Sequence, residues 1–239
     1  MRIDNNQTKE IDSESYRYIS SYIDEDLKDE FFFPKNSIDA DCVEKILEVG
    51  CGTGQYLNAW KNKYSASKAI GIEPSIDGVN LLNNKWKNEA GLDFQSAFAH
   101  NLPFESDMFD VVITSSVLHW IGRNEYLQSL GELVRVCKKY LCVMDFVASK
   151  NYRVKYQHKE GLYTYKQDFE PIITASGVMK PIEVLRFWCP NTHQVKYVKL
   201  KESELKPFEG NVLSYHARKM VIFEKDYNLL PLKKEDDFI

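Results

Sequence analysis

Three glycines at positions 50, 52 and 54, directly after a short apolar run, constrain the fold more than any other feature of this chain. Residues 46–49 are apolar apart from Glu48 and are typical of a buried strand of a parallel sheet. Glycine adopts backbone angles closed to other residues and lets a ligand approach the main chain without meeting a Cβ atom. From Gln55 onward the apolar residues follow a helical period. The segment therefore predicts a strand, a glycine turn and a helix, the half-unit of a doubly wound sheet, which binds ligands at the carboxyl ends of its strands.

Two classes of ligand use such a turn, and the spacing of the glycines distinguishes them. The dinucleotide fingerprint is G-x-G-x-x-G, with the pyrophosphate held at the helix N-terminus. Here the third glycine comes one residue early, at Gly54, and Gln55 occupies the fingerprint position. Glu48, which precedes the first glycine by two positions, attracts a cation and repels a pyrophosphate. The turn thus favours a positively charged ligand, and a nicotinamide-dependent oxidoreductase is the alternative.

The run Glu48-Val-Gly-Cys-Gly-Thr-Gly resembles motif I of the class I S-adenosylmethionine-dependent methyltransferases, and the resemblance extends over residues 45–145. The passage Leu102-Pro-Phe followed by Phe109-Asp-Val-Val is similar to the branch that methylates small molecules, with a type 11 methyltransferase domain. The resemblance implies an α/β fold: a Rossmann-like, doubly wound, seven-stranded sheet with a C-terminal antiparallel hairpin. It also implies S-adenosylmethionine as cofactor, with S-adenosylhomocysteine as its product.

The same resemblance indicates which residues bind this cofactor. Glu73 ends a predicted strand at residues 69–73, about twenty residues after the turn, where a carboxylate can accept hydrogen bonds from both ribose hydroxyls. Many relatives have an aspartate just before the position of Ala99 to accept from the adenine amino group, but this chain has Phe98. Backbone groups of Ala99 or the side chains of His100 or Asn101 could replace it, or Phe98 could face the ring. The predicted cofactor-binding residues are Glu48, Gly50, Cys51, Gly52, Gly54, Gln55, Glu73, Pro74, Ala99, His100, Asn101 and Ser115.

Two histidines are the candidates for catalysis. Methyl transfer requires alignment of donor and acceptor and exclusion of water, and a base is useful when the acceptor is a hydroxyl or a protonated amine. His119 is the first candidate, because in the family the loop after the fourth strand passes beside the transferred methyl. His158 is the second, since it lies among tyrosines in residues 151–165, an expected insertion or lid over the acceptor. His216, just before the last predicted strand, is a weaker candidate.

The tyrosine- and histidine-rich insertion favours an acceptor that forms hydrogen bonds. We therefore expect methylation of a small polar metabolite, at the oxygen of a sugar, sugar phosphate or related biosynthetic intermediate. Phe98 differs from the aspartate of many relatives, and for this reason we retain an alternative interpretation. In this alternative the chain is a non-catalytic, methyltransferase-like partner subunit.

The resemblance and the shift of composition after Ala148 also imply how the chain is organised. We expect one methyltransferase domain over residues 1–229, with a cofactor-binding core at 40–148, the acceptor lid and C-terminal strands at 149–229, and a solvated tail at 230–239. Further elements expected are helices within 15–30, 124–139 and 166–175 and strands at 92–99, from 111, at 140–147, 182–188 and 219–224.

Composition excludes several other functions. The formal charge of -4 gives no general attraction to nucleic acid. The residues Thr114-Ser-Ser-Val also lack the Asp- or Asn-Pro-Pro-aromatic sequence of enzymes that methylate nucleobase amines. The five cysteines show no C-x-x-C spacing, and Asp145 alone makes no metal site. No apolar run approaches the roughly 18 to 20 residues of a membrane span. We therefore expect a cytoplasmic enzyme without a metal, acting on a small molecule and not on nucleic acid or a membrane.

Overall fold

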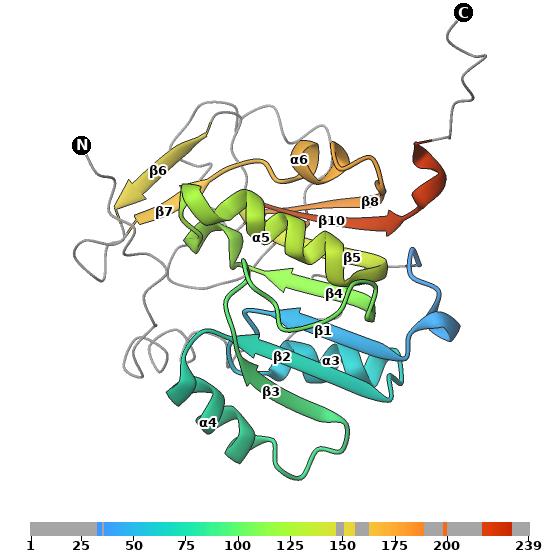
Figure 1. Cartoon of the computed structure of the whole chain (residues 1–239), viewed down its shortest axis with the longest axis vertical. Helices are drawn as coiled ribbons and strands as arrows, with labels where there is room; N and C mark the ends of the chain where they lie inside the picture. Colours follow the sequence, from blue (N-terminus) through green and yellow to red (C-terminus); the bar gives the residue numbers. More distant parts are fainter. Residues whose placement is uncertain are drawn as a thin grey trace, which may run out of the picture.

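The structure is a computed structural model that describes residues 33–34, 36–146, 151–155, 163–188, 198–199 and 217–230. A central sheet with helices on both faces dominates it (Figure 1). The strand order is β3-β2-β1-β4-β5-β10-β8-β9, in which β3 to β5 run parallel and β10 pairs antiparallel with both β5 and β8. The predicted seven-stranded sheet with a C-terminal antiparallel hairpin is confirmed, and the two-residue strand β9 extends its edge.

The described elements comprise the strands and helices of the central sheet, a separate hairpin and three short 3-10 helices. The sheet and its helices are β1 (Lys45–Val49), α3 (Gln55–Lys63), β2 (Lys68–Glu73), α4 (Ile76–Lys85), β3 (Leu92–Ser96), β4 (Phe109–Ser115), α5 (Arg123–Val136), β5 (Cys137–Phe146), α6 (Glu170–Thr174), β8 (Met179–Trp188), β9 (Val198–Lys199) and β10 (Ala217–Lys225). A separate hairpin consists of β6 (Tyr152–Lys155) and β7 (Tyr163–Lys166). Short 3-10 helices are η2 (Ala40–Cys42), η3 (Leu118–Trp120) and η7 (Tyr227–Leu229).

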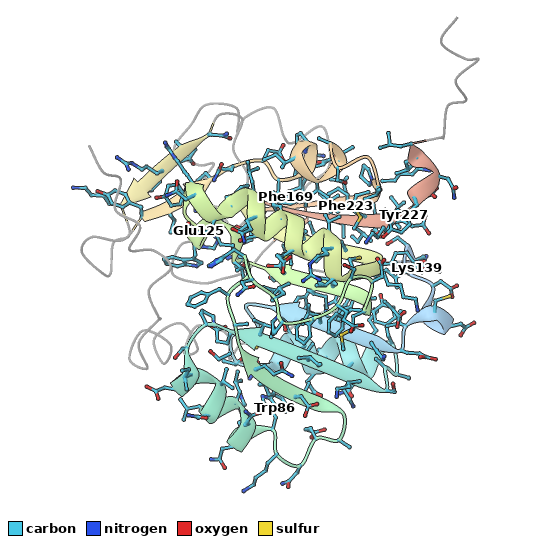
Figure 2. The ribbon with its side chains drawn as sticks, in the orientation of Figure 1. Trp86, Glu125, Lys139, Phe169, Phe223 and Tyr227 are labelled. Atoms are coloured by element: carbon cyan, nitrogen blue, oxygen red, sulfur yellow. The ribbon has the colours of Figure 1, made fainter. Side chains whose placement is uncertain are left out.

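Alternate residues of each buried strand face opposite helical layers. On one face Ile46 of β1 belongs to the same core as Leu57 and Trp60 of α3. On the other face lie the residues that pack under α5 and α6, and Figure 2 labels Phe169 and Phe223 in this second core. Strands buried on both faces are typical of parallel sheets, which helices cover on each side. The carboxyl ends of β1, β2 and β4 therefore meet at one edge, where their arrows point in Figure 1.

Some predicted boundaries were wrong. Helix α5 ends at Val136 and not at residue 139, because Cys137 already pairs with Phe109 in the β4–β5 ladder. Strand β3 ends at Ser96 and not at residue 99, because a tight turn follows in which the Asn101 N–H donates to the Phe98 carbonyl. The helix expected over 166–175 is reduced to α6, since Lys166 belongs to β7.

Several predictions fall on segments that the structure does not describe. The N-terminal helix within residues 15–30, the candidates His158 and His216, and residues 231–239 of the tail all lie outside the described residues. Of the expected lid, the β6–β7 hairpin is described, and β7 packs against η3. None of the helices described here is both long and apolar enough to cross a membrane.

Candidate functional site

The glycine turn between β1 and α3 depends on glycine for two reasons. Gly50, Gly52 and Gly54 have φ angles of 75°, 52° and 76°, in the left-handed region that other residues rarely adopt. Space is also short, because a Cβ atom at Gly50 would lie 2.2 Å from Val117 Cγ2 and one at Gly54 would lie 2.7 Å from Phe94 Cζ. Gly54 provides no side chain to cap α3, so the first N–H groups of this helix need other acceptors.

Two buried carboxylates meet at this turn. Glu73, at the end of β2, accepts a hydrogen bond from the Gly52 N–H over 3.2 Å. Burial raises the pKa of Glu73 to about 7, although the hydrogen bond from Gly52 opposes the shift. Burial, followed by the negative charge of Glu73, also raises the pKa of Glu48 well above its usual range.

Glu48 is only 2% exposed, and its Oε2 atom has no hydrogen-bond partner in the described part of the chain. A backbone hydrogen bond from Leu57 in the first turn of α3 partly offsets the cost of burying this side chain. Since Glu73 raises the pKa of Glu48, the two carboxylates are close enough to repel each other. A positive charge at the turn would reduce both this repulsion and the cost of burial.

Trp86 fixes the turn from the far end of α4 (Figure 2). Its indole Nε1 donates a hydrogen bond to the Thr53 carbonyl over 2.8 Å. In the sequence, Trp86 follows Val79 and Leu82 at helical spacing, a pattern that indicates only packing on the inner face of α4. Nothing in that spacing indicates a partner 33 positions earlier in the chain.

The other predicted cofactor residues surround the turn. Cys51 is buried beside Gly71, since a Cβ atom at Gly71 would lie 2.6 Å from Cys51 Sγ. Gln55 begins α3, Pro74 follows β2 and precedes the α4 cap, and Ser115 ends β4. Ser75 caps the N-terminus of α4, because its side chain accepts from the Gly78 N–H.

The loop after β3 carries the residues predicted near adenine. The rings of Phe98 and His100 stack with centroids 5.4 Å apart and planes inclined by 22°. Asn101 is exposed, and Ala99 packs against the second core. Because Ser96 pairs with Glu73 across the β2–β3 ladder, this loop starts beside the Glu73 carboxylate. The loop offers aromatic surfaces and backbone groups at the position where relatives have an aspartate.

His119 forms a buried pair with Asp145 of β5. The Nδ1 atom of His119 lies 2.7 Å from Asp145 Oδ1, and the side chains are only 7% and 3% exposed. The N–H groups of His119 and Phe146 also donate to the Asp145 carboxylate, over 3.3 and 2.6 Å. An ionised carboxylate only accepts hydrogen bonds, so we assign the hydrogen to Nδ1, which leaves Nε2 as the basic nitrogen.

Burial lowers the pKa of His119 below its ordinary value of 6.5, against the opposing effect of Asp145. The imidazole is therefore neutral at pH 7 and able to accept a proton at Nε2. In the sequence, Asp145 stands out only as a lone carboxylate that makes no metal site. His119 and Asp145 are 26 residues apart, and no local sequence pattern predicts that they pair. They come together because β4 and β5 are neighbours in the sheet and end side by side.

Val117 connects this pair to the glycine turn. Thr114 of β4 pairs with Val49 of β1, and the Val117 side chain then fills the space beside Gly50. Helix η3, which carries His119, begins at the next residue. The predicted catalytic loop and the predicted cofactor turn thus adjoin at one edge of the sheet. No group of three or more His, Cys, Asp or Glu side chains in the described ranges is arranged to hold a metal ion.

Comparison with known proteins gives a consistent picture. Residues 46–140 match the family model described as a methyltransferase domain. The ubiquinone/menaquinone biosynthesis C-methyltransferase of Campylobacter jejuni is 30% identical over 109 residues, which cover 43% of this chain and 44% of that protein. The fatty-acid O-methyltransferase of Mycolicibacterium smegmatis is 30% identical over 95 residues, covering 40% of this chain and 34% of that protein. This chain therefore matches less than half the length of either relative.

Among solved structures, a S-adenosylmethionine-dependent methyltransferase from Methanosarcina mazei superimposes with a TM-score of 0.58. The superposition covers 80% of this chain and 95% of the other, at 13% sequence identity. At this identity the likeness shows the fold alone.

Proposed function

Because the chain belongs to the class I S-adenosylmethionine-dependent methyltransferases, we propose that it transfers a methyl group from S-adenosylmethionine to a small-molecule acceptor. The observation that carries the proposal is the meeting of Glu48 and Glu73, both buried, at the glycine turn. S-adenosylmethionine brings positive charge to such a site, whereas the pyrophosphate of a nicotinamide cofactor would add negative charge to it.

Each part of the site has a role in holding the cofactor under this proposal. The Glu73 carboxylate accepts from the ribose hydroxyls, and Glu48 balances positive charge at the turn. Gly52 lets the ligand approach the main chain, and Phe98 and His100 offer their rings and backbone to the adenine. When bound, S-adenosylmethionine supplies an electrophilic methyl group.

His119 is proposed as the general base. Its neutral Nε2 accepts the proton of an acceptor hydroxyl, while Asp145 holds the ring in the required tautomer and stabilises the imidazolium that forms. A base of this kind suits an oxygen acceptor, whose hydroxyl must lose its proton. The charged groups of Asp145, Lys166 and Arg218 act on His119, which supports the proposed O-methylation of a small polar metabolite such as a sugar, sugar phosphate or related intermediate.

Calorimetric titration tests the cofactor assignment. S-adenosylmethionine, S-adenosylhomocysteine and NADH are titrated in parallel into the full chain. We expect saturable micromolar binding of the first two and none of NADH. Binding of NADH alone would overturn the proposal in favour of the oxidoreductase. Binding of S-adenosylmethionine without S-adenosylhomocysteine release from any acceptor pool would instead favour the non-catalytic partner subunit.

The affinity for S-adenosylhomocysteine should depend on the protonation of Glu73. The ionised carboxylate accepts from the ribose hydroxyls at both of its oxygens, whereas protonation turns one oxygen into a donor, and the pKa of Glu73 is about 7. Ligand binding must therefore displace a proton below pH 7, and we expect Kd to rise up to about tenfold for each pH unit as the pH falls below this value.

The Glu73→Gln variant is the control for this pH dependence. It should bind more weakly at pH 8, by about 1 to 3 kcal/mol for the lost hydrogen bonds to a charged group. It should also lose the extra pH dependence below pH 7, while titration of the ligand's own amine contributes equally to both proteins. An identical slope in the wild type and in Glu73→Gln would contradict the role given to this carboxylate.

A further inference from the structure

The peptide unit between Thr53 and Gly54 is held at both of its polar groups. Its carbonyl accepts a hydrogen bond from the Trp86 indole Nε1 over 2.8 Å. Its N–H, that of Gly54, donates to the Cys51 carbonyl over 2.8 Å. A peptide unit is planar, so a bond that fixes its carbonyl also fixes the direction of its N–H. Trp86, at the C-terminal end of α4, therefore orients the backbone inside the glycine turn (Figure 2).

The preceding peptide unit of the turn extends this connection to Glu73. The Cys51 carbonyl, which accepts from Gly54, belongs to the peptide unit between Cys51 and Gly52. The N–H of the same unit, that of Gly52, donates to Glu73 Oε2 over 3.2 Å. Hydrogen bonds in series polarise one another. Three hydrogen bonds and two planar peptide units thus form a hydrogen-bond path from the Trp86 indole to the Glu73 carboxylate.

Residues outside the turn hold the indole of Trp86 in place. A Cβ atom at Gly54 would lie 2.8 Å from Trp86 Nε1 and 2.7 Å from Phe94 Cζ, so both rings pack against the backbone of the turn. The main-chain N–H of Trp86 donates to the Leu82 carbonyl in α4, and Lys85 Nζ lies 5.3 Å from the centre of the indole ring. The donor at the start of the hydrogen-bond path is therefore fixed by α4 and β3.

We propose that Trp86 is a positioning residue for the cofactor, because its indole N–H keeps the Gly52 N–H on the Glu73 carboxylate in the orientation that accepts the ribose hydroxyls. The proposal rests on the proposed function, since it takes Glu73 to bind the ribose. Without the indole N–H the Thr53–Gly54 peptide unit is free to rotate, and the two hydrogen bonds that follow it weaken. The ligand must then order the turn as it binds, which lowers its affinity.

The first test compares Trp86→Phe with the wild type by calorimetric titration of S-adenosylhomocysteine at pH 8. Phenylalanine keeps an aromatic ring at this position and removes the N–H, and we expect Kd to rise about fivefold or more, the ratio typical of one lost hydrogen bond. Trp60→Phe is the matched control. Trp60 is a buried tryptophan of α3 in the core against which Trp86 packs, and within the described residues its indole donates to no atom of the turn. This control should bind S-adenosylhomocysteine as the wild type does.

The pH dependence of binding separates positioning from a merely structural role. Burial raises the pKa of Glu73 to about 7, and the hydrogen bond from Gly52 opposes this shift. Weakening of that bond in Trp86→Phe should raise the pKa further, so Kd should begin to increase at a pH higher than in the wild type by up to about one unit. In the described chain, Glu73 acts electrostatically on Glu48 of β1 and on Cys51 of the turn, and Trp86→Phe replaces neither.

A second measurement leaves Trp86 unchanged and decides the question if Trp86→Phe does not fold. The indole N–H signal of Trp86 is followed by NMR in the free wild type. It is identified by its nuclear Overhauser effect to Gly54, since a Cβ atom at Gly54 would lie 2.8 Å from the indole nitrogen. Because the hydrogen-bond path ends at Glu73, ionisation of this carboxylate should shift the signal with a midpoint near pH 7. The shift should be absent in Glu73→Gln.

Three results would overturn the inference. The first is an affinity in Trp86→Phe that equals that of the wild type or of Trp60→Phe. The second is a loss of affinity in Trp86→Phe with no shift in the pH dependence, and the third is an indole signal that does not respond to Glu73. If the wild type binds S-adenosylhomocysteine, each of these results leaves the proposed function intact. Failure of the wild type to bind S-adenosylhomocysteine would overturn the proposed function itself.

Discussion

Replacing His119 with alanine is expected to lower kcat by about 10²- to 10⁴-fold, the range typical of a lost general base. The expectation follows from the buried pair with Asp145, which fixes the imidazole with Nε2 as its basic atom. The variant should bind S-adenosylhomocysteine as the wild type does, because His119 is not among the groups proposed to hold the cofactor. The measurement is the rate of S-adenosylhomocysteine formation at saturating acceptor.

The pH profile gives an independent check on this role. Since the base must be unprotonated, activity should fall as the pH drops through the His119 pKa, which burial places below 6.5. That acidic limb should be absent from the residual activity of His119→Ala. Full turnover by His119→Ala would exclude His119 as the base.

Asp145→Asn tests the positioning role of the carboxylate. An amide can donate as well as accept, so it can stabilise the wrong imidazole tautomer, and kcat should fall by up to about 10⁴-fold, as in related dyads. Asp145→Glu, which keeps the charge, should restore part of the activity. An unchanged kcat in Asp145→Asn would show that the pair serves stability alone.

Substituting valine for Gly52 is expected to weaken S-adenosylmethionine binding at least about a hundredfold, roughly 2.8 kcal/mol. Gly52 has a φ of 52°, and its N–H donates to the Glu73 carboxylate. A branched side chain at this position disfavours the required backbone angle and occupies the path by which the ligand approaches the main chain. Calorimetry measures the loss of affinity, and circular dichroism checks that the fold is retained.

Gly131→Ala is the matched control. Gly131 is exposed on helix α5, and a Cβ atom there would meet nothing within 4 Å. Alanine in a helix is favoured over glycine by about 0.5 to 1 kcal/mol, so this variant should be slightly more stable and bind cofactor normally. Unchanged affinity in Gly52→Val would contradict the location of the cofactor site.

The sequence by itself determined the features that depend on local sterics and periodicity. Glycines at positions 50, 52 and 54 predicted a turn with unusual backbone angles, and all three have positive φ. The apolar runs predicted the parallel strands, and they predicted that Glu73 would end the second of them. The structure places Glu73 at the end of β2, where its carboxylate accepts a hydrogen bond from the Gly52 N–H. Each of these features depends on residues within one strand–turn–helix unit or the strand that follows it. Patterns over a short stretch of sequence are therefore enough to predict them.

Only the tertiary structure decided the partnerships between distant residues. Asp145 looked like an isolated acid in the sequence, and it became the partner of His119 because β4 and β5 end side by side. The same holds for Trp86 with Thr53. Periodicity shows which face a side chain takes, but the strand order and register of the sheet decide which side chain lies opposite. These depend on the packing of the whole sheet between its helices, which no local pattern encodes.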